Sequence, residues 1–493
     1  MHTYDIIIVG AGIVGTTIAR ELSRYHLDVL ILEKEYDVSM GATKANSAIV
    51  HGGYAEKHTT LKGRMCFPGR QEFKRLDSEL NFGFAETGSL VVTMEDDRGP
   101  LEALLANGIE NGLDDLEIVD GQRVQELEPE LNPDIKWALY CKGAGVCSPY
   151  EMAIAMAENA VHNGVDLRLE HEVQAMEPDH HGENGRAFLV HTDKESFRGR
   201  YILNAAGVFA DQVAGMLGTA GFEINPRSGE YLIFARDTGR AINSVVFQLP
   251  TKLGKGVLVA STYHGNLLIG PDASDDSPRE DTSTHMERIA KIYEQTKTLY
   301  GAMDPKKFLR SFTGIRARSS TNDFIIRSSQ DFPEFIQIAG IQSPGLTASP
   351  IIARRAMELL QAVGCEFREN PQFDPNRAPI IVKKDLLPFP DIKHLIDMPA
   401  APEKIICRCE QVRESEIVDA LHRGIPVKAI DGVKRRTRVT MGWCQGTFCR
   451  SRVAEVMERE YGHPVDTRFD IEHSGVNRVM KSELLEYLEG QAE

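Results

Sequence analysis

The sequence has no long hydrophobic run and no excess of basic residues. Its longest apolar stretches, such as DIIIVG and VLIL, have the length of a β-strand and fall far short of the roughly 20 residues of a membrane-spanning helix. We therefore predict no membrane span. The formal net charge is −16, whereas a protein that neutralises phosphate groups needs a basic face. The composition thus argues against a nucleic-acid partner.

Cysteine is also scarce, with eight residues in a chain of 493. This number does not suggest a disulfide scaffold, and clustered cysteines in a reducing compartment are typical of metal or redox centres. Four of them do cluster, at Cys407, Cys409, Cys444 and Cys449. No basic segment or cleavage signal precedes the first strand, YDIIIVG. We expect a cytoplasmic location, with any membrane association arising through a partner.

The length predicts more than one domain, because a single hydrophobic core stops growing at about 250 to 300 residues. The first segment reads strand, glycine turn, helix, strand, and residues 201–218 and 335–364 repeat the strand, small-residue turn and helix. Three such units on one sheet would form a nucleotide-binding domain that is discontinuous in sequence. Residues 80–145 and 226–310 contain alternating patterns such as GEYLIFA, which are typical of antiparallel strands in an inserted domain.

The C-terminal part has a different character. Residues 376–404 are rich in proline and lack a sustained helical period, so we interpret them as a linker. A compact module with the four clustered cysteines follows. A charged tail then ends in KSELLEYLEG, which is a helical pattern.

The segment GAGIVG has the spacing of a dinucleotide-binding turn. Gly10 permits the tight turn, Gly12 lets the backbone approach a pyrophosphate, and Gly15 lets the helix pack on the strand. Glu33 ends the next strand, 18 residues after Gly15, where an acid can bind ribose hydroxyls. This context favours dinucleotide binding over a simple packing turn. The motif by itself does not separate NAD from FAD.

Residues 1–375 resemble the D-amino-acid-oxidase-like superfamily of flavoenzymes, through this opening, the segment LNAAGVFADQVA and the late turn GIQSPGLTASP. The resemblance implies FAD as the cofactor. It also implies an α/β fold: a Rossmann-like FAD-binding domain with an inserted antiparallel substrate domain, followed here by a small helical domain. Glu172 and Val173 stand where these folds commonly contact the adenine. The residues expected to contact FAD are Gly10, Gly12, Ile13, Val14, Gly15, Glu33, Lys34, Asn46, Ser47, Val173, Ala206, Gly207, Gly345, Leu346 and Thr347.

The predicted division of the chain follows from these patterns. FAD-binding segments span residues 1–80, 146–225 and 311–375, and substrate segments span 81–145 and 226–310. The linker covers 376–404, the cysteine module 405–460 and the tail 461–493.

The cysteine module has the pattern C-x-C, 34 residues, then C-x4-C. Four thiolates could bind zinc or a 2Fe-2S cluster. The segment resembles the bacterioferritin-associated-ferredoxin-like domain, which implies a 2Fe-2S cluster held by Cys407, Cys409, Cys444 and Cys449. A basic run lies between the cysteine pairs, at Lys434, Arg435, Arg436 and Arg438. We interpret it either as a solvated loop or as charges that raise the cluster potential or dock an acidic electron acceptor.

A flavin and a one-electron cluster in one chain divide the work of oxidation. The flavin takes two electrons as hydride, and the cluster passes them on singly. This indicates a dehydrogenase that delivers electrons to a partner, which we expect to be a second flavoprotein or an iron–sulfur subunit.

His51, in the stretch NSAIVHGGY, is the candidate catalytic base. A lone histidine beside apolar residues is more often structural. However, the stretch is similar to one in flavoenzymes that oxidise an alcohol beside an acidic group, namely glycerol-3-phosphate oxidases and dehydrogenases and L-2-hydroxyglutarate dehydrogenases. The resemblance implies that His51 removes the hydroxyl proton. We expect Gly52 and Gly53 to let the backbone lie close under the flavin.

An anionic substrate, a polyol phosphate or a 2-hydroxy acid, needs cations. Arg316 in TGIRARSS is the first candidate because a guanidinium binds phosphate or carboxylate in bidentate fashion. Lys255 resembles a phosphate-contacting lysine of the glycerol-3-phosphate oxidases, and Arg318 and Tyr231 are further candidate substrate ligands. The resemblance favours an sn-glycerol-3-phosphate dehydrogenase. The alternatives are an L-2-hydroxyacid dehydrogenase, an amine or opine oxidase, and an electron-transfer subunit without its own substrate.

Overall fold

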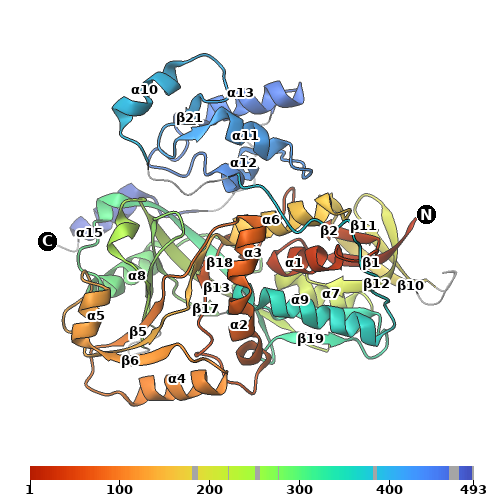
Figure 1. Cartoon of the computed structure of the whole chain (residues 1–493), viewed down its shortest axis with the longest axis horizontal. Helices are drawn as coiled ribbons and strands as arrows, with labels where there is room; N and C mark the ends of the chain where they lie inside the picture. Colours follow the sequence, from red (N-terminus) through yellow and green to blue (C-terminus); the bar gives the residue numbers. More distant parts are fainter. Residues whose placement is uncertain are drawn as a thin grey trace.

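The computed structural model describes residues 1–179, 187–219, 221–249, 256–275, 277–380, 386–465 and 477–490. A large body built on two β-sheets carries a smaller lobe formed near the C-terminus (Figure 1). No helix in these ranges is long and apolar enough to cross a membrane.

The first sheet has eight strands and a parallel centre. β1 (Thr3–Val9) lies between β12 (Ser196–Asn204) and β2 (Val29–Glu33), and β20 (Phe335–Ala339) pairs with the other edge of β12. β1, β12 and β20 belong to the three predicted units, so the prediction that these units share one sheet is confirmed. The remaining strands are β9 (Asp166–Leu169), β10 (Val173–Asp179), β11 (Ala187–Thr192) and β19 (Ile325–Ser328).

Helices cover both faces of this sheet, which explains why β1 ends in the unbroken apolar run Ile6–Val9. Ile6 and Ile8 pack on one face with α1 (Ile13–Leu22), α6 (Pro149–His162) and α9 (Gly345–Ala362). Ile7 points to the other face, where α7 (Ala210–Gly215) supplies Val213.

The second sheet has nine strands, and its longest pair is β13 (Ile224–Phe234) with β18 (Phe308–Ser319). It is mixed rather than purely antiparallel, because β5 (Ser89–Thr93) and β14 (Val245–Gln248) run parallel. These two strands come from the two separate inserted segments, which meet at this point of the sheet. Its other strands are β6 (Leu116–Asp120), β7 (Trp137–Cys141), β15 (Leu258–Ser261), β16 (Leu267–Gly270) and β17 (Ser274–Asp275).

The position of β18 corrects the predicted division of the chain. Residues 311–319 were assigned to an FAD-binding segment, but they pair with β13 in the second sheet. The same strand also contacts Ala45 in the first predicted FAD-binding segment. A Cβ atom on Gly314 would lie 3.0 Å from the carbonyl carbon of Ala45. β18 therefore lies at the boundary between the two sheets.

The second sheet is covered by helices that include the C-terminal one. The predicted helix in the tail is confirmed as α15 (Lys481–Gly490), which packs beside α8 (Met286–Leu299) and buries Leu484 completely (Figure 1). Smaller elements complete the body: α2 (Leu61–Gln71), α3 (Phe73–Leu80), α4 (Gly99–Glu110), α5 (Gly121–Leu127), β3 (Ile49–Val50), β4 (Phe84–Ala85), β8 (Gly145–Cys147), η1 (Ala42–Lys44), η2 (Gly207–Phe209), η3 (Thr238–Ala241) and η4 (Pro305–Lys307).

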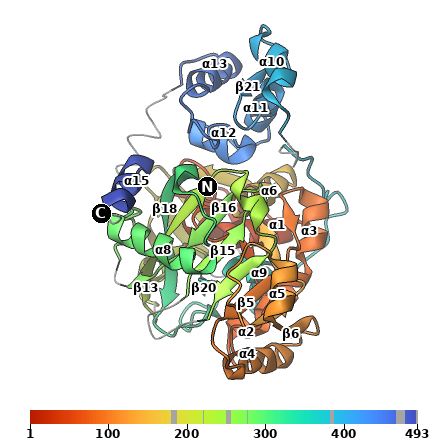
Figure 2. The same cartoon turned by 90° about the vertical axis from the view of Figure 1, so that its left-hand side faces the viewer.

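The smaller lobe lies above the body with α12 (Ile430–Thr437) on the side that faces it (Figure 2). Its other elements are β21 (Ile405–Cys407), β22 (Val412–Arg413), α11 (Glu414–Leu421) and α13 (Arg450–Tyr461).

The interpretation of residues 376–404 as a linker without helix is wrong in part. They contain α10 (Phe389–Asp397), which buries Ile392 and Ile396 against Ile405. These two isoleucines are four residues apart, so a single helical stripe, too short to stand out in the sequence, stabilises α10.

Candidate active site

A cavity of about 1840 Å³ lies between the two sheets and the smaller lobe. Pockets for a single drug-sized ligand measure roughly 300 to 1,000 Å³, so this one has room for a dinucleotide and a small substrate. It brings together most of the predicted site residues. Those in its lining are Gly10, Gly12, Ile13, Val14, Glu33, Lys34, Asn46, Ser47, His51, Val173, Ala206, Gly207, Tyr231, Arg316, Gly345 and Leu346.

The glycine-rich turn opens α1 at one wall of this cavity. Gly12 is the N-cap and supplies no side-chain cap, while the backbone N–H of Ile13 donates to Oγ1 of Thr43 over 3.0 Å. Gly10 has φ +105°, and a Cβ atom there would lie 2.6 Å from the carbonyl oxygen of Ala205. Gly15 is absent from the cavity lining and packs on the backbone of Gly10 instead. The N-terminus of α1 and the glycine backbone beside it offer N–H groups and leave room where side chains would otherwise lie. This arrangement fits a pyrophosphate.

Glu33 ends β2 beside this turn. Its Oε2 accepts the N–H of Ala11 over 2.7 Å, and its Oε1 accepts the N–H of Glu35 over 3.0 Å. Burial raises the pKa of Glu33 to about 7. The carboxyl group is thus fixed at the cavity wall, where the ribose of a dinucleotide would accept or donate hydrogen bonds.

His51 follows β3 and faces the same cavity near the start of α9. Its backbone N–H donates to Oγ1 of Thr347 over 2.9 Å, and its Nε2 lies 3.1 Å from the Ser343 hydroxyl. The ring of Phe247 is stacked at 6.1 Å. Burial, and after it the nearby Arg316 guanidinium, lowers the pKa of His51 to about 4. The imidazole is therefore neutral near pH 7 and able to accept a proton.

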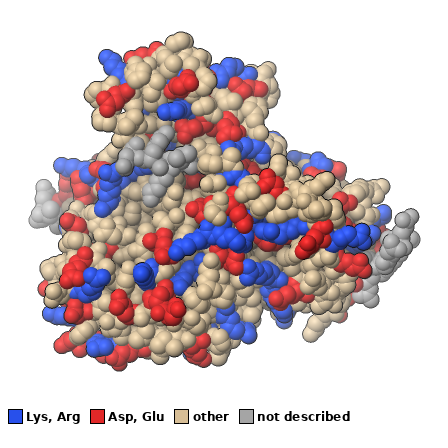
Figure 3. All heavy atoms as spheres, in the orientation of Figure 1, with Lys and Arg blue, Asp and Glu red and all other residues tan. Residues whose placement is uncertain are grey.

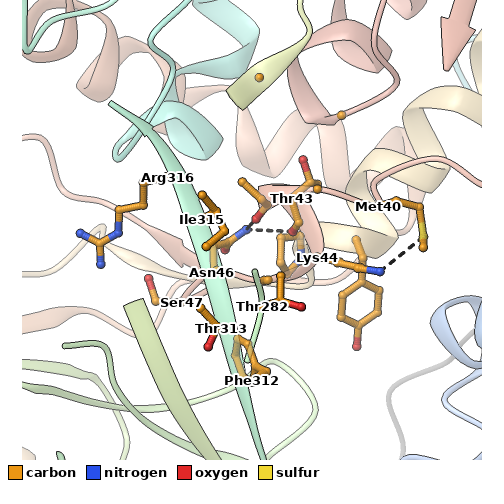
Figure 4. A pocket seen from close by; sticks show the side chains of 18 of the residues that line it. Met40, Thr43, Lys44, Asn46, Ser47, Thr282, Phe312, Thr313, Ile315 and Arg316 are labelled. Atoms are coloured by element: carbon orange, nitrogen blue, oxygen red, sulfur yellow. Dashed lines mark hydrogen bonds between the residues drawn. The ribbon is translucent and has the colours of Figure 1, made fainter. Parts of the chain in front are cut away.

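Arg316 lies on β18 and faces the cavity, beside Ser47 and on the opposite side of the strand from Lys44 and Met40 (Figure 4). Its neighbours Arg227 and Arg318 both pair with Asp275, whereas no carboxylate in the described ranges forms an ion pair with Arg316. A guanidinium without a carboxylate partner in a cavity is suited to bind an anion.

An aromatic pair lines the same part of the cavity. Tyr231 on β13 stacks on Phe312 of β18 with 4.8 Å between the ring centres and 7° between the planes. Burial raises the pKa of Tyr231, while Arg316 acts in the opposite direction. The predicted position of Tyr231 in the pocket agrees with this geometry.

The structure corrects two predictions for this region. Arg318 pairs with Asp275 over 3.2 Å and is absent from the cavity lining, so it is not placed to bind substrate. Gly52 and Gly53 do not leave room for a flavin: a Cβ atom on Gly52 would lie 2.6 Å from Sγ of Cys141, and one on Gly53 would lie 3.0 Å from Cβ of Phe67. The space beside these glycines is filled by protein.

Of the remaining two predicted residues, the structure describes only Thr347. Thr347 is fully buried and supports His51 through its hydroxyl group rather than lining the cavity. Lys255 lies outside the described residues.

Sequence reasoning missed three residues of the site. Thr43 caps the turn, Ser343 contacts the imidazole, and Phe247 stacks on it. Thr43 could have been found from its place in GATKANS, three residues before Asn46. Ser343 lies in the predicted turn GIQSPG, where the glycines predict the backbone and nothing marks the serine side chain. Nothing in the pattern around Phe247 distinguishes it from a residue of the core.

The four clustered cysteines form two pairs. The Sγ atoms of Cys409 and Cys444 are 3.6 Å apart, and the thiols of Cys407 and Cys449 are hydrogen-bonded. No three potential ligands converge on a single metal ion in the part of the chain that the structure describes. A structural zinc ion needs four ligands around one point, whereas a 2Fe-2S cluster takes four thiolates, two for each iron. The arrangement fits the cluster better than zinc.

The loop that carries these cysteines forms a wall of the large cavity. Met441 and Gln445, on either side of Cys444, belong to its lining. The Tyr150 hydroxyl at the start of α6 lies 3.7 Å from Sδ of Met441. A centre held by the cysteines would thus lie beside the cavity that fits the dinucleotide.

The basic run is neither the solvated loop nor the exposed docking patch that the sequence suggested, while its effect on the cluster potential stays a prediction. Arg435, Arg436 and Arg438 are 3%, 2% and 5% exposed, and Lys434 pairs with Asp431 over 3.5 Å. Arg435 and Arg436 bind Asp37 of the body, and Arg438 binds Glu410. The run is neither solvated nor available to dock an acceptor.

Comparisons with known proteins agree with this arrangement. Residues 5–359 match the family described as FAD dependent oxidoreductase, and residues 405–459 match the BFD-like [2Fe-2S] binding domain. The chain is 40% identical to a glycerol 3-phosphate dehydrogenase from Caloramator mitchellensis, over 96% of this chain and 97% of that protein. It is 24% identical to the anaerobic glycerol-3-phosphate dehydrogenase subunit A1 of Haloferax volcanii, over 93% of this chain and 83% of that protein.

A solved structure with bound FAD supports the cofactor assignment. The dithionite-reduced L-alpha-glycerophosphate oxidase of Mycoplasma pneumoniae superposes with a TM-score of 0.72 at 30% identity, and covers 76% of this chain and 99% of its own. The predicted cofactors, FAD and a 2Fe-2S cluster, and the predicted fold class are confirmed. The chain belongs to the FAD dependent oxidoreductase family, and its C-terminal lobe is a 2Fe-2S binding domain.

Proposed function

We propose that this protein is a dehydrogenase that oxidises sn-glycerol 3-phosphate to dihydroxyacetone phosphate and passes the electrons through its 2Fe-2S cluster to a partner protein. The observation that carries the proposal is the pair of His51 and Arg316, which line one cavity. The imidazole is neutral, and the arginine pairs with no carboxylate among the residues that the structure describes. The relatives named glycerol 3-phosphate dehydrogenase and oxidase support the choice of substrate.

The oxidation of a secondary alcohol removes a hydride, which FAD accepts when it is bound, and a hydroxyl proton. His51 is suited to take the proton at Nε2, because that atom already lies 3.1 Å from a hydroxyl group, that of Ser343. The Thr347 hydroxyl holds the backbone of His51 against α9. A base positioned in this way contributes about 10² to 10⁴ in rate.

Arg316 is suited to hold the phosphate group through two parallel N–H donors. Its positive charge also adds to the effect of burial in lowering the pKa of the His51 imidazole. The stacked rings of Tyr231 and Phe312 limit the width of the pocket beside it. Lys255 stays a proposed second phosphate ligand on the resemblance alone. The proposed electron acceptor is a second flavoprotein or an iron–sulfur subunit, in keeping with the similarity to a protein named as a subunit.

The substrate assignment is tested by mixing the oxidised protein with candidate alcohols in the absence of air. We expect sn-glycerol 3-phosphate to bleach the visible absorbance of the flavin and L-2-hydroxyglutarate to leave it unchanged. Bleaching by L-2-hydroxyglutarate alone would favour the alternative dehydrogenase. No bleaching by any polyol phosphate or 2-hydroxy acid would overturn the proposal and leave an amine or opine oxidase or an electron-transfer subunit.

The role of His51 is tested by the His51→Gln variant. The rate of flavin reduction by substrate should fall about 10²- to 10⁴-fold, since a positioned base is lost, while the FAD content stays unchanged. His58→Gln is the control, because His58 contacts Asn111 outside the cavity. An unchanged rate in His51→Gln rules out the proposed base.

The role of Arg316 is tested by comparing Arg316→Met with Arg318→Met, two identical changes on one strand. Loss of a charge-assisted contact worth about 1.5 to 3 kcal/mol should raise KM about 10- to 100-fold in Arg316→Met. Arg318→Met should leave KM unchanged, because Arg318 pairs with Asp275.

The pH profile gives a second readout of the same pair. His51 must be neutral to act, so kcat/KM of the unmodified protein should fall only as the pH drops toward about 4. In Arg316→Met this acid limb should move to higher pH, because the cation that lowers the pKa of His51 is gone. A limb near pH 6.5 in both proteins would contradict the proposed geometry.

A further inference from the structure

The face of α12 that is turned toward the body carries a buried ion-pair cluster. Asp37, which follows β2, is 1% exposed and lies between Arg435 and Arg436. Its Oδ2 is 2.6 Å from Nη2 of Arg435 and 2.7 Å from Nη1 of Arg436, and its Oδ1 is 2.9 Å from Nη2 of Arg436. The two guanidinium groups use both carboxylate oxygens.

Other charges along the seam, the boundary between the body and the smaller lobe, are complementary as well. Acids of the body face bases of the lobe: Glu158 lies 3.7 Å from Nε of Arg436, and Glu170 pairs with Lys428. A second polar bridge joins Nη2 of Arg438 to Oδ1 of Asn266 over 3.0 Å. Acidic and basic side chains meet at the junction of the two lobes in the space-filling view (Figure 3).

Burial of these charges indicates a role in orientation. Removing charges from water is costly, and a buried ion pair often stabilises a fold less than apolar packing would, so such a pair is better suited to fix one arrangement. Two arginines on one carboxylate define direction as well as distance, because each guanidinium donates in a fixed plane. A lobe shifted along the seam would leave Asp37 or the arginines buried without partners.

Asp37 belongs to the N-terminal segment that also forms the glycine-rich turn. Arg435 donates from Nη1 to the carbonyl of Val38 over 2.8 Å, and the N–H of the next residue, Ser39, donates to the carbonyl of Ala11 in the glycine-rich turn over 2.9 Å. Glu33 lies four residues before Asp37. The lobe is therefore fastened to the part of the body that fits FAD, and its cysteine loop contacts the cavity at Tyr150.

We propose that Asp37 is a positioning residue, which docks the 2Fe-2S domain through Arg435 and Arg436 so that electrons pass from the flavin cavity to the cluster within one chain. The inference rests on the proposed function only for the direction of electron flow. The two electrons taken from the alcohol reach the cluster one at a time, and the first must leave to an external one-electron acceptor protein before the second arrives.

The test compares Asp37→Asn with Lys428→Ala in the full-length holoprotein. Lys428 pairs with Glu170 across the same seam, but their side chains are 53% and 35% exposed, so solvent screens this pair and it contributes less than the buried one. Breaking one partner of a buried pair should lower the docked population about 100-fold or more. After photoreduction of the flavin without air, Asp37→Asn should show slowed reduction of the cluster and a larger radius of gyration by X-ray scattering, and Lys428→Ala should match the unmodified protein.

Photoreduction separates this inference from the proposed substrate, because it needs no glycerol 3-phosphate. If Asp37→Asn binds FAD poorly, Arg436→Gln serves in its place, since Arg436 makes two contacts with Asp37 from the lobe and does not line the cavity. Iron content shows that its lobe is folded. Unchanged cluster reduction and compactness in whichever variant retains both cofactors would overturn the proposal.

Discussion

One buried carboxylate between two guanidinium groups joins the two redox parts of this protein. Asp37 and its partners Arg435 and Arg436 are each at most 3% exposed, in a seam where uncompensated charge would be costly. The large cavity depends on this contact, because the cysteine loop of the lobe supplies part of its wall. The lobe is thus a structural component of the flavin site as well as a carrier of the cluster.

The residues proposed to carry out the chemistry lie where the two sheets meet at this cavity. The parallel sheet presents the glycine-rich turn and Glu33 at the carboxyl ends of its strands, where α/β folds bind nucleotides. The second sheet contributes Arg316 and Tyr231 from the paired strands β18 and β13. His51, directly after the short strand β3, lines the same cavity. The proposed base and the proposed anion ligand therefore hold their relation through packing of the body alone.

The sequence predicted what depends on local backbone requirements. Gly10, Gly12 and Glu33 were identified because a tight turn, a close approach and a strand end each demand a residue type. Arg316 and Arg318 carry the same side chain two residues apart. They differ because Arg318 pairs with Asp275, a residue distant in the sequence. Arg435 and Asp37 lie 398 positions apart, so no local pattern could show that the basic run is buried. The predicted space beside Gly52 failed for the same reason, since Cys141 fills it from another strand.

The proposal common to both redox sites is that substrate oxidation and cluster reduction occur in one chain through one shared cavity. It is tested most directly by rapid mixing of the protein with sn-glycerol 3-phosphate without air, with flavin absorbance and the electron paramagnetic resonance of the cluster followed together. The flavin should bleach first, and the signal of the reduced cluster should follow at a rate independent of protein concentration. A cluster that stays oxidised, or a rate that rises with protein concentration, would contradict it.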